Sequence, residues 1–273
     1  MFPVKKHLTK ILSFVLVISA CLGSWPVFAD ETIRIGGVGS AMGSMKFLGT
    51  AFEVIVFRSL GTSGAIAALA KGAIDIGVAG RPFTQEELKL DMSVIEYART
   101  PVVFAVKTDN SISGFSRDDL IKMIKGNTTA WPGGQRARPV LRPVTDAETI
   151  IIKKADPDIG LAIEEALAPG GMIVALTAQE AADAIEKTPG AFGISTLSLI
   201  QSERRSLRAV PFNGVSPNLE NIANGSYQFV MSYWMLTKPK PSKVVSDFVD
   251  FVQSAPGRRI LEESGHYVEP REK

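Results

Sequence analysis

The sequence is nearly free of the two side chains that most often build metal and nucleophilic sites. It has one cysteine, Cys21, and two histidines, His7 and His266, among 273 residues. No disulfide can form within one chain, and there are too few ligands for a zinc site of the Cys/His type. Relays that pair histidine with a serine or cysteine nucleophile are poorly supported for the same reason. The composition therefore argues against those enzyme classes.

Nucleotide-binding loops are lacking as well. No Gly-Lys-Ser or Gly-Lys-Thr occurs, which excludes a Walker loop. Gly37 and Gly39 give two glycines of a dinucleotide fingerprint, but Met42 stands where the third is required. Asp146 and Glu148 lie two positions apart, and on a helix this spacing would point them in very different directions. They do not suit a matched catalytic acid and base.

The sequence also lacks an excess of positive charge once its first segment is set aside. Residues 1–29 have the features of a secretory signal, with a lysine-bearing start, an apolar core over 11–22 and small residues suited to cleavage after Ala29. Cleavage would remove three of the 30 Lys and Arg and none of the 28 Asp and Glu, so the formal charge would change from +2 to −1. The exported chain then offers no electrostatic case for binding nucleic acid or a membrane surface.

The same segment permits a second interpretation centred on Cys21. The stretch Ile18–Cys21 resembles a lipoprotein box, in which the cysteine would be lipidated and retained, although leucine is usual where Ile18 stands. We expect a soluble protein of the periplasm or another extracytoplasmic space, with lipid anchoring at Cys21 as the alternative.

What the sequence does contain is a pair of glycine-rich loops, each between a predicted strand and a predicted helix. Ile33–Gly43 reads IRIGGVGSAMG, and Ser59–Gly64 reads SLGTSG after a strand over Glu53–Phe57. A helix that begins at such a loop presents unpaired backbone N–H groups and the positive end of its dipole, which suits an anion. Either loop alone could be an ordinary tight connection. Their repetition suggests one binding cleft.

Two arginines follow predicted strands. Ala73–Ala79 reads as a buried parallel strand that ends at Gly80-Arg81, so Arg81 lies where open α/β sheets bind ligands. It could donate to an anion, clamp two halves together or be an ordinary surface arginine at a turn. Arg142 lies in a predicted strand over 140–144, and a helix start follows it.

The remaining chain continues to alternate between strands and helices. Further strands are predicted over 101–106, 191–194, 207–211 and 227–236. Helices are predicted to begin at 84–87 and 116–119 and to cover 150–154, 159–167, 178–187, 242–254 and 256–263. Trp131 is expected to pack its loop onto the domain. The alternation predicts an α/β fold with a mostly parallel sheet.

Five motifs then occur in order over nearly all of the chain beyond residue 29: GxGS, SLGTSG, AIDIGVAGRPFTQEE, GAFGIS and NGSYQFVMSYWMLTK. This succession resembles the phosphate-type substrate-binding proteins of ABC importers, with SLGTSG and IDIG…RP as the more specific matches. The resemblance implies a two-lobed, periplasmic-binding-protein-like (type II) α/β fold with a ligand cleft between lobes. Lobe one would comprise 32–103 plus 227–273, and lobe two 104–226, with the crossing strands as hinge.

In that family phosphate is held without metal by hydroxyls, helix N-terminal amides, an arginine and an aspartate. Ser40 and the Ala41 amide match the first loop, Thr62 matches the second-loop serine, and Arg142 matches the lobe-two arginine. The expected ligand-binding residues are Ser40, Ala41, Thr62, Ser63, Gly64, Arg81, Arg142, Asp146 and Thr149.

Two departures from the family pattern bear on the ligand. Gly80 stands where the phosphate-accepting aspartate is expected, and the loop after the second-lobe arginine reads Val144–Thr149 in place of Gly-Ser-Gly-Thr. Arg81 adds positive charge and favours a fully ionised oxyanion, whereas Asp146 and Glu148 add negative charge. Either an Arg142–Asp146 pair orients the guanidinium, or the ligand carries a cation that meets the carboxylates.

The resemblance implies capture of a small oxyanion, phosphate first, and its delivery to an inner-membrane ABC permease. We expect a monomer without cofactor or metal that is not an enzyme. A sensor that reports to a membrane receptor would use the same architecture. A degenerate member with a zwitterionic or organic-acid ligand, or with none, is the main rival. An enzyme on this fold would need a catalytic base near Ser40 or Thr62, and none is evident.

Overall fold

The computed structural model describes residues 32–168 and 172–270, and from Thr32 onward the chain forms one compact unit. The predicted signal over 1–29, with Cys21, lies outside the described residues. In the described ranges, no helix combines the length and apolar character that crossing a membrane requires.

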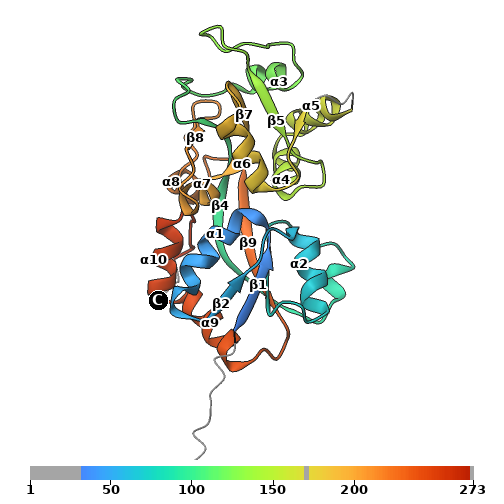
Figure 1. Cartoon of the computed structure of the whole chain (residues 1–273), viewed down its shortest axis with the longest axis vertical. Coiled ribbons are helices and arrows are strands. Elements are labelled where there is room, and N and C mark those ends of the chain that lie inside the picture. Colours follow the sequence, from blue (N-terminus) through green and yellow to red (C-terminus); the bar gives the residue numbers. More distant parts are fainter. Residues whose placement is uncertain (1–31, 169–171, 271–273) are drawn as a thin grey trace, which may run out of the picture. The chain divides into compact units, whose positions relative to one another are not determined.

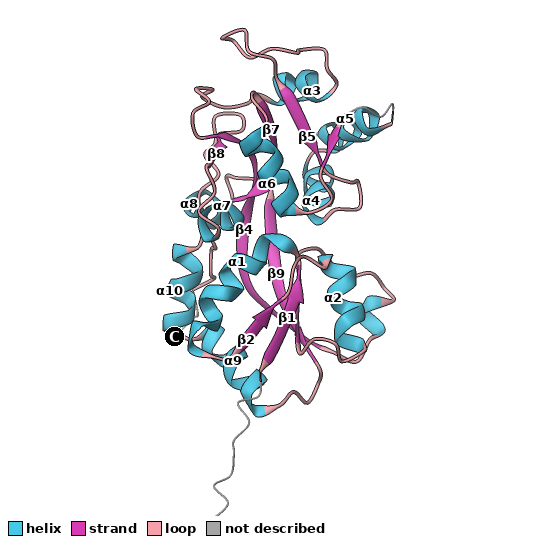
Figure 2. Cartoon of the chain, in the orientation of Figure 1, coloured by secondary structure: helices cyan, strands magenta, loops and turns pink. Residues whose placement is uncertain are grey.

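The described chain builds one mixed sheet with helices on its faces (Figures 1 and 2). Its strands are β1 (Ile33–Gly37), β2 (Val54–Val56), β3 (Ile76–Ala79), β4 (Ser93–Lys107), β5 (Arg138–Leu141), β6 (Ile173–Val174), β7 (Ala191–Thr196), β8 (Leu207–Val210) and β9 (Val230–Thr237). They lie in the order β2-β1-β3-β9-β4-β7-β5-β6, and β8 pairs with β4. The predicted α/β class is confirmed.

The sheet is parallel only toward its two ends. β1 pairs in parallel with β2 and β3, and β5 pairs in parallel with β6 and β7. The pairings of β9 with β3 and of β4 with β7, β8 and β9 are antiparallel. The expectation of a mostly parallel sheet therefore fails in the middle, because β4 and β9 run antiparallel to their neighbours there.

Strand β4 joins the two parallel groups. Its residues 93–101 pair with β9, and its residues 102–107 pair with β7 and β8. The sequence predicted only the second part, because Pro101 marked a strand boundary. The proline is tolerated because it pairs with Val230, the first residue of β9, where the β9 ladder ends. The division into lobes at 103/104 and 226/227 stays a prediction.

Most predicted helices are present, with small shifts at their ends. The helices are α1 (Gly39–Leu48), α2 (Gly61–Ala70), α3 (Arg117–Ile124), α4 (Ala147–Ala155), α5 (Pro157–Leu167), α6 (Ala178–Lys187), α7 (Leu197–Ser202), α8 (Leu219–Ala223), α9 (Lys243–Gln253) and α10 (Ala255–Glu263). The predicted cap of α3 is confirmed, since Ser116 Oγ accepts from the Asp119 amide at 3.1 Å. Thr177 and Glu180 form the predicted capping box of α6. The short helices α7 and α8 were not predicted.

The helix predicted to begin at Thr84 is only a 3-10 turn, η2 (Glu87–Lys89). Its acidic start serves a different purpose, because the Glu87 carboxylate accepts from the Thr84 amide and from Arg81. Leu88 and Leu90 are exposed, so the segment has no apolar face to pack. Without that packing a short segment does not propagate into an α-helix.

Aromatic side chains fill the core beside β4 and β7. Trp131 is buried at 6% exposure, with its ring 5.9 Å from Phe115 and 5.5 Å from Phe192 between centroids. Its indole N–H donates to the Gly190 carbonyl at 3.0 Å. The prediction that Trp131 packs its loop onto the domain is confirmed.

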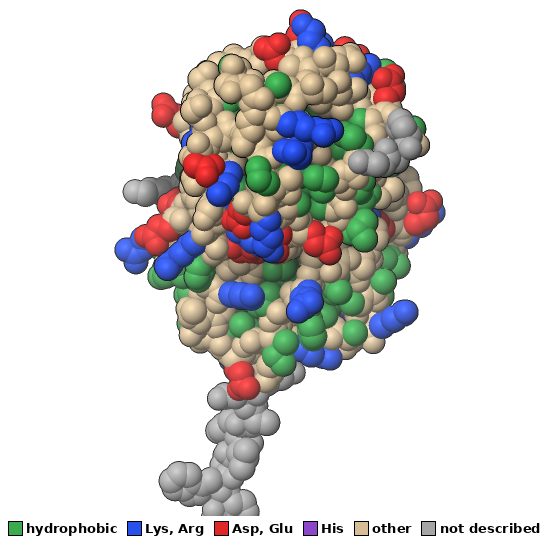
Figure 3. Space-filling view, turned by 45° about the horizontal axis from the view of Figure 1, so that its top comes forward, with side chains coloured by type: hydrophobic (Ala, Val, Ile, Leu, Met, Phe, Trp, Pro, Cys, Tyr) green, Lys and Arg blue, Asp and Glu red, His purple; other side chains and the backbone are tan. Residues whose placement is uncertain are grey.

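Charged side chains of both signs share the surface. On the face shown in Figure 3, Lys and Arg are interspersed with Asp and Glu rather than gathered into a patch of one sign. A basic patch is what nucleic-acid binding requires, so this face is not built for it.

Candidate ligand-binding site

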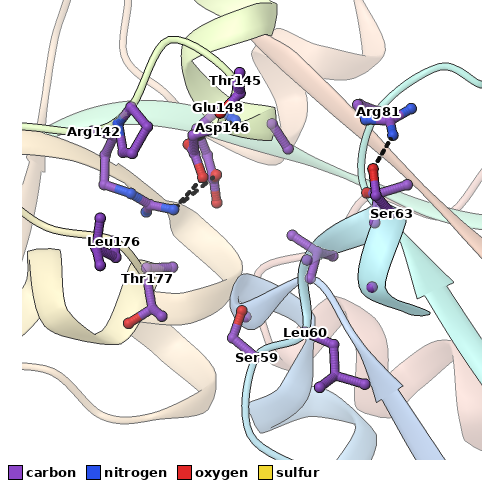
Figure 4. Close-up of a pocket in the computed structure, with 18 residues that line it drawn as sticks. Ser59, Leu60, Ser63, Arg81, Arg142, Thr145, Asp146, Glu148, Leu176 and Thr177 are labelled. Atoms are coloured by element: carbon purple, nitrogen blue, oxygen red, sulfur yellow. Dashed lines mark hydrogen bonds and ion pairs between the residues drawn. The ribbon is translucent and has the colours of Figure 1, made fainter. Parts of the chain in front are cut away.

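A pocket of about 290 Å³ lies beyond the carboxyl ends of the parallel strands (Figure 4). The loops that follow β1, β2, β3, β5 and β6 all contribute to its lining. Carboxyl ends of parallel strands are where open α/β folds place their ligands. Both parallel groups of the sheet therefore contribute to one site, and both glycine loops border it, as their repetition suggested.

Two helices begin at this pocket without a side-chain cap. The N-cap residues of α1 and α2 are Val38 and Leu60, and neither helix has an acidic residue in its first turn. Gly61 begins α2 with φ +66, a left-handed conformation that favours glycine. The positive ends of both helix dipoles are thus unmatched by side chains of their own helix.

The structure brings most predicted site residues together. Six of the nine line the pocket: Thr62, Ser63, Gly64, Arg81, Arg142 and Asp146. Ser40, Ala41 and Thr149, each buried at 2% exposure or less, are not part of the lining. Ser40 lies behind the pocket wall, where its hydroxyl faces Met231 Sδ at 3.8 Å. Ligand contact by these three residues stays a prediction.

Four polar lining residues were not among the predicted ligands: Ser59, Thr145, Glu148 and Thr177. Each carried a signal, because Ser59 opens the second glycine loop, Thr145 and Glu148 lie near Asp146, and Thr177 caps a helix. The sequence could not show that the loop before α6 lies next to the loop before α2.

The absence of an aspartate after β3 has a steric reason. A Cβ on Gly80 would lie 3.2 Å from Met231 Sδ and 3.2 Å from both methyl carbons of Val38. The Gly80 amide donates to Thr62 Oγ1 at 3.0 Å. This corner is filled by packing and by a hydrogen bond, so a larger residue would have to displace its neighbours.

The hydrogen-bond partners of the Arg81 side chain lie close to it in the sequence. Its guanidinium forms a two-pronged pair with Glu87, with both N–O distances 2.8 Å, and donates to Ser63 Oγ at 2.7 Å. The hydrogen bonds from Arg81 lower the pKa of Glu87. Figure 4 shows Arg81 turned toward Ser63, away from Arg142. Arg81 orders one wall of the pocket, and its role as anion donor or clamp stays a prediction.

Arg142 forms the opposite wall and is 3% exposed. It donates to Asp146 Oδ1, which confirms the predicted pair, and its Nη2 lies 3.8 Å from Glu148 Oε2. Its Nε and Nη1 and both Glu148 carboxylate oxygens have no hydrogen-bond partner among the described residues. Buried polar atoms are normally paired, so this wall is built to meet a further polar group.

The two carboxyl groups beside Arg142 share one negative charge at neutral pH. Burial, with the negative charge of Glu148, raises the pKa of Asp146 to about 9, although Arg142 acts in the opposite direction. Burial alone would raise the pKa of Glu148, but the Arg142 charge is the largest opposing cause and the pKa is lowered. The charge of the pair is therefore favoured on Glu148, while Asp146 Oδ1 accepts from Arg142 and Asp146 Oδ2 accepts from the Glu148 amide.

The pocket is chemically a binding site for a small polar molecule. It offers an arginine, hydroxyls and helix N-termini as donors, and one buried carboxylate as acceptor. In the described part of the chain, no group of three or more His, Cys, Asp or Glu is placed to hold a metal ion.

Comparison with known proteins places the chain in a family. The model of the PBP superfamily domain matches residues 32–256, so the chain belongs to the PBP superfamily. The phosphate-binding protein PstS of Bacillus subtilis is 25% identical over 201 residues, which cover 71% of this chain and 64% of that protein. PstS of Borreliella burgdorferi is 24% identical over 218 residues, covering 77% and 78% respectively. The match thus spans less than two thirds of the Bacillus protein.

A solved structure supports the same fold. A candidate phosphate ABC transporter substrate-binding protein from Clostridium perfringens, with bound phosphate, superposes with a TM-score of 0.74 at 19% identity. The superposition covers 88% of this chain and all of that one. The fold implied by the sequence motifs is confirmed, and the family is confirmed at the level of the PBP superfamily.

Proposed function

We propose that this chain is an exported solute-binding protein that captures phosphate and delivers it to the permease of an ABC importer. The observation that carries the proposal is Arg142, a 3%-exposed guanidinium in the pocket wall whose Nε and Nη1 have no partner in the described chain. Phosphate oxygens suit such a donor. The relatives described above are named as phosphate-binding proteins.

Two lobes would close around the ligand, one of residues 32–103 and 227–273 and the other of 104–226. The pocket lining supports this division, because Ser59–Gly64 and Arg81 come from the first set and Arg142–Glu148 from the second. A bridge also links the two sets, since Gln179 Nε2 donates to the Gly39 carbonyl at 2.9 Å. β4 and β9 would act as the hinge, and closure would complete a site that neither lobe holds alone.

The role is binding rather than catalysis, and the protein acts as a monomer outside the cytoplasm. Residues 1–29 would direct export, and lipid anchoring at Cys21 is the alternative form of the same location. Histidine and cysteine are absent from the pocket lining, and its one ionised carboxylate faces an arginine rather than a nucleophile. No cofactor is required for the binding step.

Calorimetry on the purified protein, stripped of ligand by partial unfolding and refolding, tests the proposal against phosphate, sulfate, phosphonates and amino acids. Phosphate at a hundredfold excess over its dissociation constant should stabilise the fold by about 2.7 kcal/mol. Arg142→Gln should weaken phosphate binding at least about 30-fold, because a buried donor to the anion is lost.

Arg138→Gln is the matched control, since Arg138 begins β5, the strand that Arg142 directly follows, but donates to the Pro189 carbonyl outside the pocket. Circular dichroism and thermal unfolding would verify that both variants fold. Equal phosphate affinity of Arg142→Gln and the unchanged protein would refute the site. A response to amino acids with none to phosphate would refute the ligand.

A further inference from the structure

Glu148 places a carboxylate among the groups that would hold the ligand. It lies in the first turn of α4, is 1% exposed, and has Oε2 3.8 Å from Arg142 Nη2. Figure 4 shows the Asp146 and Glu148 side chains grouped beside Arg142. Arg142 is one of the residues that the family resemblance assigns to phosphate.

The pocket consequently has no uncompensated positive side chain. Its only lining cations, within the described chain, are Arg81 and Arg142. Glu87 pairs with Arg81 through both carboxylate oxygens, and Asp146 and Glu148 lie against Arg142. An incoming phosphate therefore meets a negative charge at the same arginine that it would bind.

We propose that Glu148 is an internal counter-anion, which competes with phosphate for Arg142 and thereby limits phosphate affinity. This inference rests on the proposed function. Two anionic groups a few ångströms apart, away from water, repel each other strongly, so phosphate must displace the Glu148 carboxylate or bind beside it at a cost. Asp146 competes less by charge at neutral pH, because burial and the Glu148 charge raise its pKa.

The direct test replaces Glu148 with its neutral isostere and measures phosphate binding by calorimetry at pH 7. Glu148→Gln should bind phosphate about tenfold more tightly or better, because the repulsion is removed while the side-chain volume is kept. The control is Glu164→Gln, which removes the same charge from α5, where Glu164 pairs with Lys153 outside the pocket. That variant should match the unchanged protein. Weaker or unchanged phosphate binding by Glu148→Gln would overturn the proposal, and weaker binding would mean that Glu148 accepts a proton from the ligand.

A second measurement, made without phosphate, separates this inference from the proposed function. Carboxyl-carbon NMR can follow the titration of Asp146, whose charged neighbours are Arg142 and Glu148. Glu148→Gln should lower the Asp146 pKa, because the charge that raises it is gone. If phosphate binds neither protein while this shift occurs, the proposed function fails and the competition fails with it. If phosphate binds both equally, or if the Asp146 pKa does not move, only the counter-anion proposal is overturned.

Discussion

The two arginines of the pocket both face carboxylates, yet they differ in what they leave unpaired. Arg81 is held on both prongs by Glu87 and on Nη2 by Ser63, all within 25 residues of chain. Arg142 is more deeply buried and directs one nitrogen to Asp146, while Nε and Nη1 have no partner among the described residues. The first arginine is satisfied by its own surroundings, and the second is not.

This difference concerns the donors that each arginine can still offer to a ligand. A guanidinium with all its donors paired gains little from an added anion, because an existing hydrogen bond must break first. An unpaired buried donor is costly in the empty protein, and a ligand that supplies an acceptor recovers that cost. Sequence position alone, at the end of a strand, made both arginines equal candidates.

The most direct test of this difference replaces each arginine in turn with glutamine. Arg142→Gln should weaken phosphate binding at least about 30-fold, whereas Arg81→Gln should weaken it only several-fold, through loss of order in the wall around Ser63. Calorimetry on both variants gives the ratio directly. A larger loss for Arg81→Gln would reverse the assignment, and would mean that Arg81 leaves Glu87 when ligand binds.

A second and smaller effect should appear at high pH on the Arg142 side alone. The pKa of Asp146 is about 9, so above that pH the pocket gains a second negative charge beside Arg142. Phosphate affinity should then fall, by about tenfold between pH 8 and pH 10. Asp146→Asn cannot ionise, so its affinity should stay level over the same range. A parallel decline in both proteins would place the titrating group elsewhere.

The sequence could predict those parts of the site that depend on local geometry. Ser59–Gly64 follows a strand and opens a helix, and that order alone directs the loop to the carboxyl edge of the sheet. The Arg142–Asp146 pair was also accessible, since the two residues are four apart on one short connection. For the same reason the sequence identified the caps of α3 and α6, whose partners lie three residues away.

Other parts depended on contacts between distant segments. Whether Ser40 faces the pocket or lies behind it is decided by how α1 packs, with the Ser40 carbonyl accepting from Ser198 of α7. Asp146 and Glu148 were expected to point apart, as two residues on one helix would. Asp146 is instead the N-cap, with extended backbone at φ −71 and ψ 146, so helical spacing does not apply and both carboxyl groups reach Arg142.

The smallest expected effect comes from making Arg81 resemble Arg142. Glu87→Gln would remove the partner charge and leave the Arg81 guanidinium partly unpaired, so phosphate affinity should rise only a few-fold. The fold should lose about 0.5–1 kcal/mol of stability at neutral pH, as for a partly exposed ion pair.

The stability lost on removing the Glu87 charge should depend on pH. The pKa of Glu87 is lowered in the folded protein by its hydrogen bonds with Arg81, so the pair stabilises the fold above the ordinary glutamate pKa. That contribution disappears as the pH falls through the folded-state pKa and the carboxylate is protonated. Urea unfolding should therefore show the largest difference between Glu87→Gln and the unchanged protein near neutral pH, with convergence on acidification. If the difference in unfolding free energy persisted in acid, Glu87 would stabilise the fold through packing or through its hydrogen bond from the Thr84 amide. The charge of Glu87 would then contribute less to holding Arg81 than the geometry of the pair indicates.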